Sequence, residues 1–202
     1  MKPITLSDST LRDGNHAASQ GLDFKHLGPL MEALDATGIE WIEVGHGNGL
    51  GASSVNFGRS PNSDREIIES AVRSINSAKV SVHAMPGIAT FLDDVAPAMD
   101  LGVQVVRVAS HCTEADTTLN MLEKVSDHGG IAVGVLMMVH RVSPTELAEQ
   151  AADMYKAGAA TVMIMDSAGS LNKDSTAERV ASLLELEMGA VGFHAHNNLG
   201  LA

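Results

Sequence analysis

The chain has 202 residues, which is enough for one domain with a sizeable hydrophobic core. Its formal net charge of -12 excludes an electrostatic nucleic-acid surface, because phosphate binding needs clustered Lys and Arg. No apolar run approaches about 18 residues, so a membrane span is excluded as well. The single cysteine, Cys112, and the lack of a signal-peptide pattern predict a globular protein of the reducing cytoplasm.

Short apolar runs alternate with longer amphipathic stretches along the chain. We predict strands over residues 3–7, 41–44, 80–85, 105–109, 132–139, 161–165 and 191–194. Between them we predict helices over residues 24–37, 63–77, 90–101, 113–128, 143–157 and 173–187. Capping residues support these helices. Ser143 and Glu146 form a candidate capping box, and Gly38, Gly102, Gly129 and Gly158 stand just after helix ends.

Strand–helix repeats of this kind indicate parallel strands joined by helical crossovers, in a doubly wound sheet or a barrel. No Gly-x-Gly-x-x-Gly follows the first strand, so a dinucleotide fold has little support. Polar residues instead collect after many strands, as expected at the rim of a barrel. They are Asp13, His16, His46, Asn48, His111, His140, Asp166, Ser167, His194 and His196. We therefore predict an α/β protein, a (β/α)8 TIM barrel, with residues 1–202 as a single catalytic domain.

The number of predicted strands is seven, whereas a barrel of this type has eight. We expect this barrel to be truncated after strand seven and to lack the last βα unit. Strands one and seven would then carry unpaired edges.

The pair His194 and His196 stands at the end of the last predicted strand. Because side chains alternate faces along a strand, both imidazoles lie on the same face and can bind one divalent metal. A third, anionic ligand must come from elsewhere. The alternative is two polar residues in a turn, which is common for a lone His-x-His pair.

The first βα loop offers Arg12, Asp13 and His16. If the barrel closes, Asp13 could complete a set of two His and one carboxylate, a set that leaves open positions for a 2-oxo acid. Arg12 would then stabilise developing negative charge, and His16 is a candidate general base. The alternative is an ordinary Arg–Asp ion pair on a turn, and spacing alone favours the site only slightly.

Residues 10–14 (Thr-Leu-Arg-Asp-Gly) and the His194-x-His196 pair resemble the metal-dependent superfamily of 3-hydroxy-3-methylglutaryl-CoA lyase and isopropylmalate synthase. Within it the chain most resembles 4-hydroxy-2-oxovalerate (4-hydroxy-2-oxoacid) aldolase. That resemblance is carried by His16 and by residues 46–54, 107–116, 136–140, 166–169 and 192–196. Lyases and synthases usually carry Gln where His16 stands, so His16 is the discriminating residue.

The resemblance implies retro-aldol cleavage of 4-hydroxy-2-oxovalerate to pyruvate and acetaldehyde, a reaction of aromatic hydrocarbon catabolism. It implies a divalent metal, Mn²⁺ before Mg²⁺, Co²⁺ or Zn²⁺, held by Asp13, His194 and His196. Arg12 would stabilise the pyruvate enolate and His16 would take the proton from the C4 hydroxyl. Substrate contacts would come from Arg12, Asp13, Ser167 and His194. The implied partner is an acylating acetaldehyde dehydrogenase.

Other residues have a structural reading of comparable weight. Ser167 can cap the turn after strand six. His46, His111 and His140 are each either supporting groups of the site or ordinary structural histidines. The Gly-rich loop 45–54 is either a close backbone approach to a ligand or a surface lid, and Cys112 is read as a buried small residue.

The chain departs from the aldolases at Asn15, where they usually carry an apolar residue, and residues 197–202 resemble the synthase branch as much as the aldolase branch. The family's eighth strand, its assisting tyrosine and its C-terminal helical region are expected beyond residue 202. Two alternatives therefore stand beside the aldolase. One is an acyl-CoA-dependent synthase or lyase of the same superfamily. The other is a non-catalytic truncated barrel that pairs through its strand edges.

Overall fold

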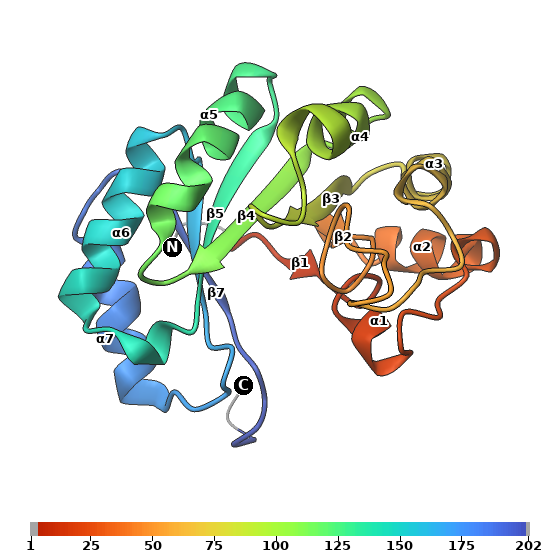
Figure 1. Ribbon diagram of the computed structural model, residues 1–202. Helices are drawn as coiled ribbons and strands as arrows, with labels where there is room; N and C mark the ends of the chain where they lie inside the picture. Colours follow the sequence, from red (N-terminus) through yellow and green to blue (C-terminus); the bar gives the residue numbers. More distant parts are fainter. Residues whose placement is uncertain (1–3, 201–202) are drawn as a thin grey trace. The chain divides into compact units, whose positions relative to one another are not determined.

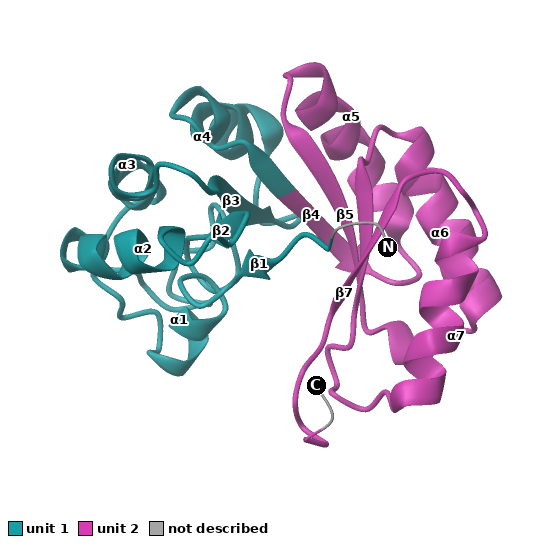
Figure 2. Cartoon of the chain, turned by 180° about the vertical axis from the view of Figure 1, so that it is seen from behind, with its two compact units in different colours: residues 1–106 teal, residues 107–202 magenta. Residues whose placement is uncertain are grey.

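The computed structural model describes residues 4–200. The chain divides into two compact units, Met1–Val106 and Arg107–Ala202, which Figure 2 colours separately. In both units strands alternate with helices along the chain (Figure 1). The prediction of a single domain over residues 1–202 stays a prediction.

Unit 1 contains β1 (Ser7–Asp8), β2 (Trp41–Glu43) and β3 (Lys79–Ala84). They pair in chain order and in parallel, with Ser7 opposite Trp41 and Ile42 opposite Val80. Its helical elements are α1 (Gly14–Ala17), η1 (Phe24–His26), α2 (Gly28–Asp35), α3 (Asp64–Ser74), η2 (Phe91–Val95) and α4 (Ala96–Asp100).

Strand β4 (Val105–His111) begins at the end of unit 1 and continues into unit 2. Unit 2 also contains β5 (Ile131–Met137), β6 (Thr161–Met165) and β7 (Ala190–His194), in the sheet order β5-β6-β7 with parallel pairing. Its helical elements are η3 (Ala115–Thr118), α5 (Leu119–Asp127), η4 (Val139–Arg141), α6 (Pro144–Lys156) and α7 (Lys173–Leu184).

The central strands are buried on both faces. In β5, which reads Ile-Ala-Val-Gly-Val-Leu-Met, the five inner residues are all buried, so apolar and polar side chains do not alternate. Continuous apolar runs are typical of parallel strands covered by helices on either side. Gly134 in this strand makes room for α6, because a Cβ there would lie 2.5 Å from the Met154 sulfur.

The predicted caps are confirmed. Ser143 and Glu146 form a capping box at the start of α6, and Ser63 and Glu66 form another at the start of α3. The four glycines predicted after helix ends have positive φ values, from 80° at Gly38 to 118° at Gly102. That left-handed conformation ends the helices at those positions.

Several predicted bounds are wrong. The first strand was predicted over residues 3–7. Pro3 lies outside the described residues, and the strand found is Ser7–Asp8, with Ile4 80% exposed. The predicted helix 24–37 is two elements, η1 and α2, because Pro29 in the first turn of α2 favours a new helix start.

Two further predicted helices are also divided. Residues 90–101 form a π-helical turn, η2, followed by α4, with Pro97 in the first turn of α4. Residues 113–128 begin as η3 before α5. The strand predicted to reach residue 139 ends at Met137, because Met138 has a left-handed backbone (φ 59°) and starts η4.

Among residues 4–200, no helix combines the length and the apolar character that a membrane crossing needs.

Candidate active site

The predicted site residues fall into two groups. Arg12, Asp13 and His16 lie on the loop after β1 and in α1, in unit 1. Ser167, His194 and His196 lie after β6 and at the end of β7, in unit 2.

The first loop is shaped by its own backbone. The Ser9 carbonyl accepts hydrogen bonds from the amides of Arg12 (3.1 Å) and Asp13 (2.7 Å), which closes a tight turn. Asn15 is fully buried, donates to the Gly45 carbonyl at 3.2 Å and accepts from the Leu22 amide. The side-chain amide of Asn15 therefore joins this loop to the loop after β2. That role explains why an Asn stands at position 15 in place of an apolar residue.

Arg12 is held in a fixed orientation. Its Nε donates to Glu43 Oε2 at 2.8 Å, and its Nη1 donates to Asp13 Oδ1 at 3.0 Å and to the Gly47 carbonyl at 3.2 Å. The remaining nitrogen, Nη2, is buried and has no hydrogen-bond partner among the described residues. A guanidinium can donate five hydrogen bonds, so Arg12 keeps capacity for an oxygen of a bound molecule.

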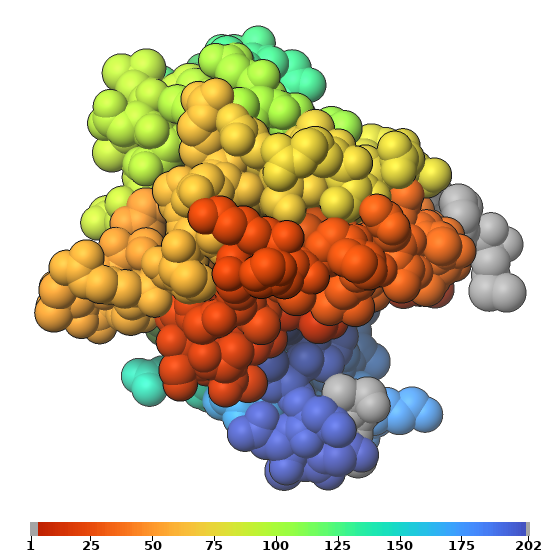
Figure 3. Space-filling model, turned by 90° about the vertical axis from the view of Figure 1, so that its right-hand side faces the viewer, coloured from red at the N-terminus to blue at the C-terminus, as the bar shows by residue number. Residues whose placement is uncertain are grey.

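His16 is exposed, and its Nδ1 lies 3.1 Å from the side-chain amide nitrogen of Gln20. The Gln20 carbonyl oxygen accepts from the Gly47 amide at 2.8 Å. In Figure 3 the red atoms of the first loop adjoin the orange atoms of the segment after β2 on the surface of unit 1. The contacts of Arg12, Asn15 and Gln20 with this segment join the two loops.

The loop after β2 is built around His46, which is fully buried. Its Nε2 lies 3.1 Å from the Gly58 carbonyl and its Nδ1 accepts from the Asn48 amide at 3.1 Å. Gly49 (φ 90°) approaches β3 so closely that a Cβ would collide with the His83 carbonyl. The His46 contacts therefore close the loop on itself, and the approach of Gly49 packs it against β3.

In unit 2 the rings of His194 and His196 lie edge to face, with centroids 5.0 Å apart. His196 Nδ1 lies 2.9 Å from the Asp166 carbonyl oxygen. Because a carbonyl only accepts, Nδ1 carries the proton and Nε2 keeps its lone pair for a metal. His194 Nδ1 lies 3.3 Å from Nη2 of the buried Arg107, which can only donate.

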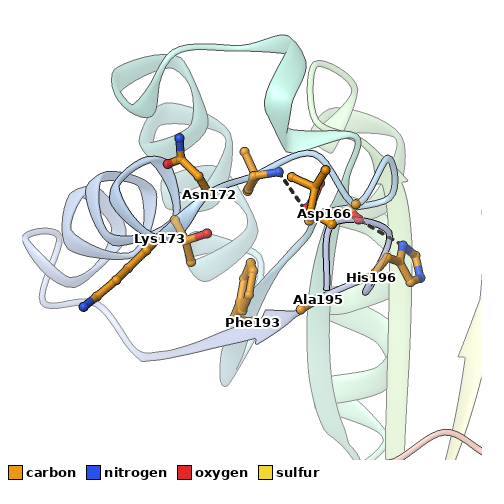
Figure 4. Close-up of a pocket in the computed structure, with 10 residues that line it drawn as sticks. Asp166, Asn172, Lys173, Phe193, Ala195 and His196 are labelled. Atoms are coloured by element: carbon orange, nitrogen blue, oxygen red, sulfur yellow. Dashed lines mark hydrogen bonds between the residues drawn. The ribbon is translucent and has the colours of Figure 1, made fainter. Parts of the chain in front are cut away.

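The loop after β6 supports His196. The Asp166 carboxylate is buried and accepts from the amides of Ser170 (3.1 Å) and Leu171 (2.9 Å). Ser167 Oγ accepts from the Met138 amide at 3.0 Å, so this hydroxyl serves the turn after β5. A cavity of about 350 Å³ lies between the start of α7 and β7. Figure 4 shows Phe193, Lys173 and His196 among the residues that line it.

Of the remaining candidates, His111 and Cys112 have local partners, whereas His140 Nδ1 is buried with no hydrogen-bond partner among residues 4–200. His111 Nδ1 lies 2.8 Å from Thr113 Oγ1, and His140 lies in η4. Cys112 is fully buried, as predicted, and donates to the Met138 carbonyl at 3.3 Å. Burial raises the pKa of the Cys112 thiol above its ordinary value, which disfavours the nucleophilic thiolate.

The sequence reasoning missed Glu43, Gln20 and the carboxylate of Asp166 as supporting groups. Glu43 had a usable signal, since an acidic residue within the apolar run of β2 needs a buried partner. Gln20 had none, because its place depends on positive φ values at Ser19 (51°) and at Gln20 itself (63°). Neither residue is a glycine, the residue type from which positive φ values can be predicted.

The donor set in unit 2 fits a divalent metal. His196 presents a lone pair at Nε2, fixed by the Asp166 carbonyl, and His194 lies beside it. If either nitrogen of His194 were to hold a metal, the Arg107–His194 hydrogen bond would be lost. Its Nδ1 would then hold the metal or a proton and could no longer accept.

The parallel βα repeats, with polar groups after the strands, define an α/β protein of the TIM-barrel type, with seven strands among residues 4–200. The chain belongs to the HMGL-like family, whose model matches residues 3–202. This confirms the resemblance that the sequence motifs predicted.

Curated relatives support this assignment. The chain is 44% identical over 199 residues to "4-hydroxy-2-oxovalerate aldolase" of Spirochaeta aurantia, covering 98% of this chain and 58% of the relative. It is 43% identical over 201 residues to "4-hydroxy-2-oxovalerate aldolase" of Pectobacterium atrosepticum, covering 100% of this chain and 59% of the relative. The chain therefore spans less than two thirds of the length of these relatives.

A solved structure agrees in fold. The carboxyl transferase domain of Rhizobium etli pyruvate carboxylase matches with a TM-score of 0.79 at 14% identity, over 97% of this chain and 36% of that one.

Proposed function

We propose that the chain is the barrel of a divalent-metal-dependent aldolase that cleaves 4-hydroxy-2-oxo acids to pyruvate and a short aldehyde. The proposal takes residues 1–202 as one catalytic domain. The names of the curated relatives support it, as does the set of polar residues on the two loops and at the end of β7.

The observation that carries the proposal is the state of Arg12. Three of its hydrogen bonds fix the guanidinium, while Nη2 is buried with no partner among residues 4–200. An unsatisfied buried donor is costly unless a ligand uses it. Because the group is permanently cationic, an anionic oxygen such as that of a pyruvate enolate suits it.

The proposed metal ligands are Asp13, His194 and His196. A bound divalent metal supplies Lewis-acid polarisation of the 2-keto oxygen. His196 is already oriented by the Asp166 carbonyl, and the Asp13 carboxylate is held by Arg12 and 36% exposed. His194 and Ser167 complete the proposed substrate contacts.

The residues of this chain have separate tasks in the proposed cleavage. His16 takes the proton of the C4 hydroxyl as the C3–C4 bond breaks, which releases the aldehyde. The electron pair of that bond forms the pyruvate enolate, and Arg12 stabilises its negative charge. Protonation of the enolate at C3 gives pyruvate and balances the proton that His16 took, which His16 then releases.

The test combines metal binding with product formation. Purified chain is titrated with Mn²⁺ and supplied with 4-hydroxy-2-oxovalerate, and released pyruvate is measured with lactate dehydrogenase. We expect about one metal per chain, loss of metal in Asp13→Ala, and retained metal with at least a tenfold lower rate in Arg12→Ala. Arg73→Ala on the exposed side of α3 is the matched control.

Metal that persists in both Asp13→Ala and His196→Ala would refute the ligand set. Cleavage of a CoA thioester in place of the 2-oxo acid would assign the chain to the acyl-CoA-dependent branch. A folded chain that binds no metal and releases no pyruvate would identify a non-catalytic barrel.

The finer points belong to the same proposal. They are manganese as the metal, acetaldehyde as the second product, a cytoplasmic location and an acylating acetaldehyde dehydrogenase as partner. Comparing Mn²⁺, Mg²⁺, Co²⁺ and Zn²⁺ in the titration tests the metal, and co-purification with the dehydrogenase tests the partner.

A further inference from the structure

We propose that Gln20 is a positioning residue that holds His16 in the tautomer with its proton on Nε2. The resting imidazole then offers a hydrogen-bond donor, and not a base, at that nitrogen. The tautomer follows from contacts within unit 1 alone, whereas its meaning for catalysis rests on the proposed function.

The orientation of the Gln20 amide is set by the backbone of Gly47. The Gly47 N–H can only donate, and it lies 2.8 Å from the atom assigned as Gln20 Oε1. The opposite orientation would place the Gln20 NH₂ group against another donor. The amide nitrogen of Gln20 must therefore face His16.

The amide then determines the imidazole. Gln20 Nε2 lies 3.1 Å from His16 Nδ1, and an NH₂ group only donates, so Nδ1 must accept. A neutral imidazole carries one proton, and with Nδ1 as acceptor that proton is on Nε2. A ring with a proton on Nδ1 would bring two donors together at this contact.

Gln20 is built into this position. Its residue is only 5% exposed, and its backbone has the left-handed φ of 63° that directs the side chain back toward His16, four residues earlier. Glycines make the space. A Cβ on Gly47 would lie 2.7 Å from His16 Nε2 and 2.8 Å from Gln20 Nε2, and a Cβ on Gly58 would lie 3.0 Å from Gln20 Cγ.

The consequence concerns the order of proton movements in the proposed cleavage. Nε2 can accept the C4 hydroxyl proton only when the ring proton is on Nδ1, and that form needs an acceptor at Nδ1. Gln20 supplies such an acceptor only if its side-chain amide rotates by 180°, which breaks the hydrogen bond from the Gly47 N–H. In the resting state His16 therefore donates to a substrate oxygen through Nε2, and turning of the Gln20 amide precedes proton uptake.

The test reads the tautomer directly. In ¹⁵N-labelled chain at about pH 8.5, where an ordinary imidazole is neutral, long-range ¹H–¹⁵N correlation distinguishes protonated from unprotonated ring nitrogens. The His16 signals are identified by their loss in His16→Gln. We expect protonated Nε2 and unprotonated Nδ1 in the wild-type chain.

Gln20→Glu should invert this pattern, because a carboxylate accepts both from Gly47 N–H and from a proton on His16 Nδ1. Gln20→Met, which keeps the bulk and removes the donor, should give a mixture of the two tautomers. Gln150→Glu in unit 2 is the matched control and should leave the His16 signals unchanged. The backbone amide spectrum verifies that each variant is folded.

A wild-type His16 with its proton on Nδ1 would overturn the proposal. So would an unchanged pattern in Gln20→Met, the variant that decides if Gln20→Glu does not fold. Neither result touches the aldolase assignment. Conversely, a chain with the expected tautomer and no aldolase activity would refute the proposed function and leave the role of Gln20 standing.

Discussion

Arg12 and Glu43 form a buried ion pair in unit 1, with Arg12 Nε 2.8 Å from Glu43 Oε2. The Arg12 side chain is 5% exposed and that of Glu43 is not exposed at all. Two charges removed from water in this way stabilise each other, because without Glu43 the guanidinium would keep only the partly exposed Asp13 as its counter-charge. Strand β2 thus fixes the orientation of the cation on the first loop.

Replacing Glu43 with Gln should lower the free energy of unfolding by about 1.5–3 kcal/mol, because a buried charge-assisted hydrogen bond is weakened while Asp13 remains as a counter-charge of Arg12. The measurement is the urea midpoint by circular dichroism. Glu32→Gln, at an exposed position on α2, is the control and should change the free energy by less than about 0.5 kcal/mol. A loss in Glu43→Gln as small as that of the control would show that the pair contributes little.

Gly47→Ala should displace the His16 ring with only a moderate loss of stability. The new Cβ would lie 2.7 Å from His16 Cε1 and Nε2, and overpacking of this kind costs about 1–3 kcal/mol. We expect shifted His16 ring signals in the NMR spectrum. Gly28→Ala, whose Cβ meets Ser74 Oγ at an ordinary 3.4 Å, is the control. Unshifted His16 signals in Gly47→Ala would mean that the ring does not rest on this residue.

Asp166→Ala should weaken metal binding without removing a ligand. The carboxylate holds the amides of Ser170 and Leu171, and the carbonyl of the same residue orients His196. Loss of such a supporting contact typically lowers metal affinity 10- to 100-fold. Titration with Mn²⁺ measures the change, and Asp174→Ala in the first turn of α7 is the control. Wild-type affinity in Asp166→Ala would show that His196 is oriented by other contacts.

The strands were largely predictable and the helix boundaries were not. Strand β6 (Thr161–Met165) was predicted with its observed bounds, because a short continuous apolar run between two helical patterns is recognisable without its neighbours. The divisions of helices 24–37 and 90–101 depend on Pro29 and Pro97, whose effect on a helix varies with position. The amphipathic pattern runs through both prolines, so periodicity alone did not reveal the breaks.

Within the site, sequence motifs identified the candidate catalytic and metal-binding residues but not the neighbouring groups that orient them. His16 was predictable as a candidate base from its place after Asp13. Its tautomer depends on Gln20 and on the backbone of Gly47, which is 27 residues further along the chain. Contacts of this range have no local pattern, because they arise from the pairing of β1 with β2.

Asp35, near the end of α2, should make the stability of the chain depend on pH in the acid range. Its carboxylate accepts from the amides of Ala78 (2.6 Å), Asn76 (2.9 Å) and Ser77 (3.1 Å), just before β3. The Ala78 hydrogen bond is the largest cause that lowers the pKa of Asp35 below its ordinary 3.8, and the bonds from Asn76 and Ser77 add to it. Because the folded pKa is the lower one, ionised Asp35 stabilises the fold above the unfolded pKa. That contribution is lost as the pH falls through the folded pKa.

We therefore expect Asp35→Ala to lower the free energy of unfolding by about 1 kcal/mol at neutral pH, as for a lost capping carboxylate that remains partly in contact with water. The difference from the wild-type chain should shrink below pH 3.8, where the unfolded carboxyl also becomes protonated. Urea midpoints measured from neutral pH to about pH 2.5 test this, with Glu32→Ala on the same helix as control. A difference that stays constant over that range would show that the effect of Asp35 is not carried by its charge.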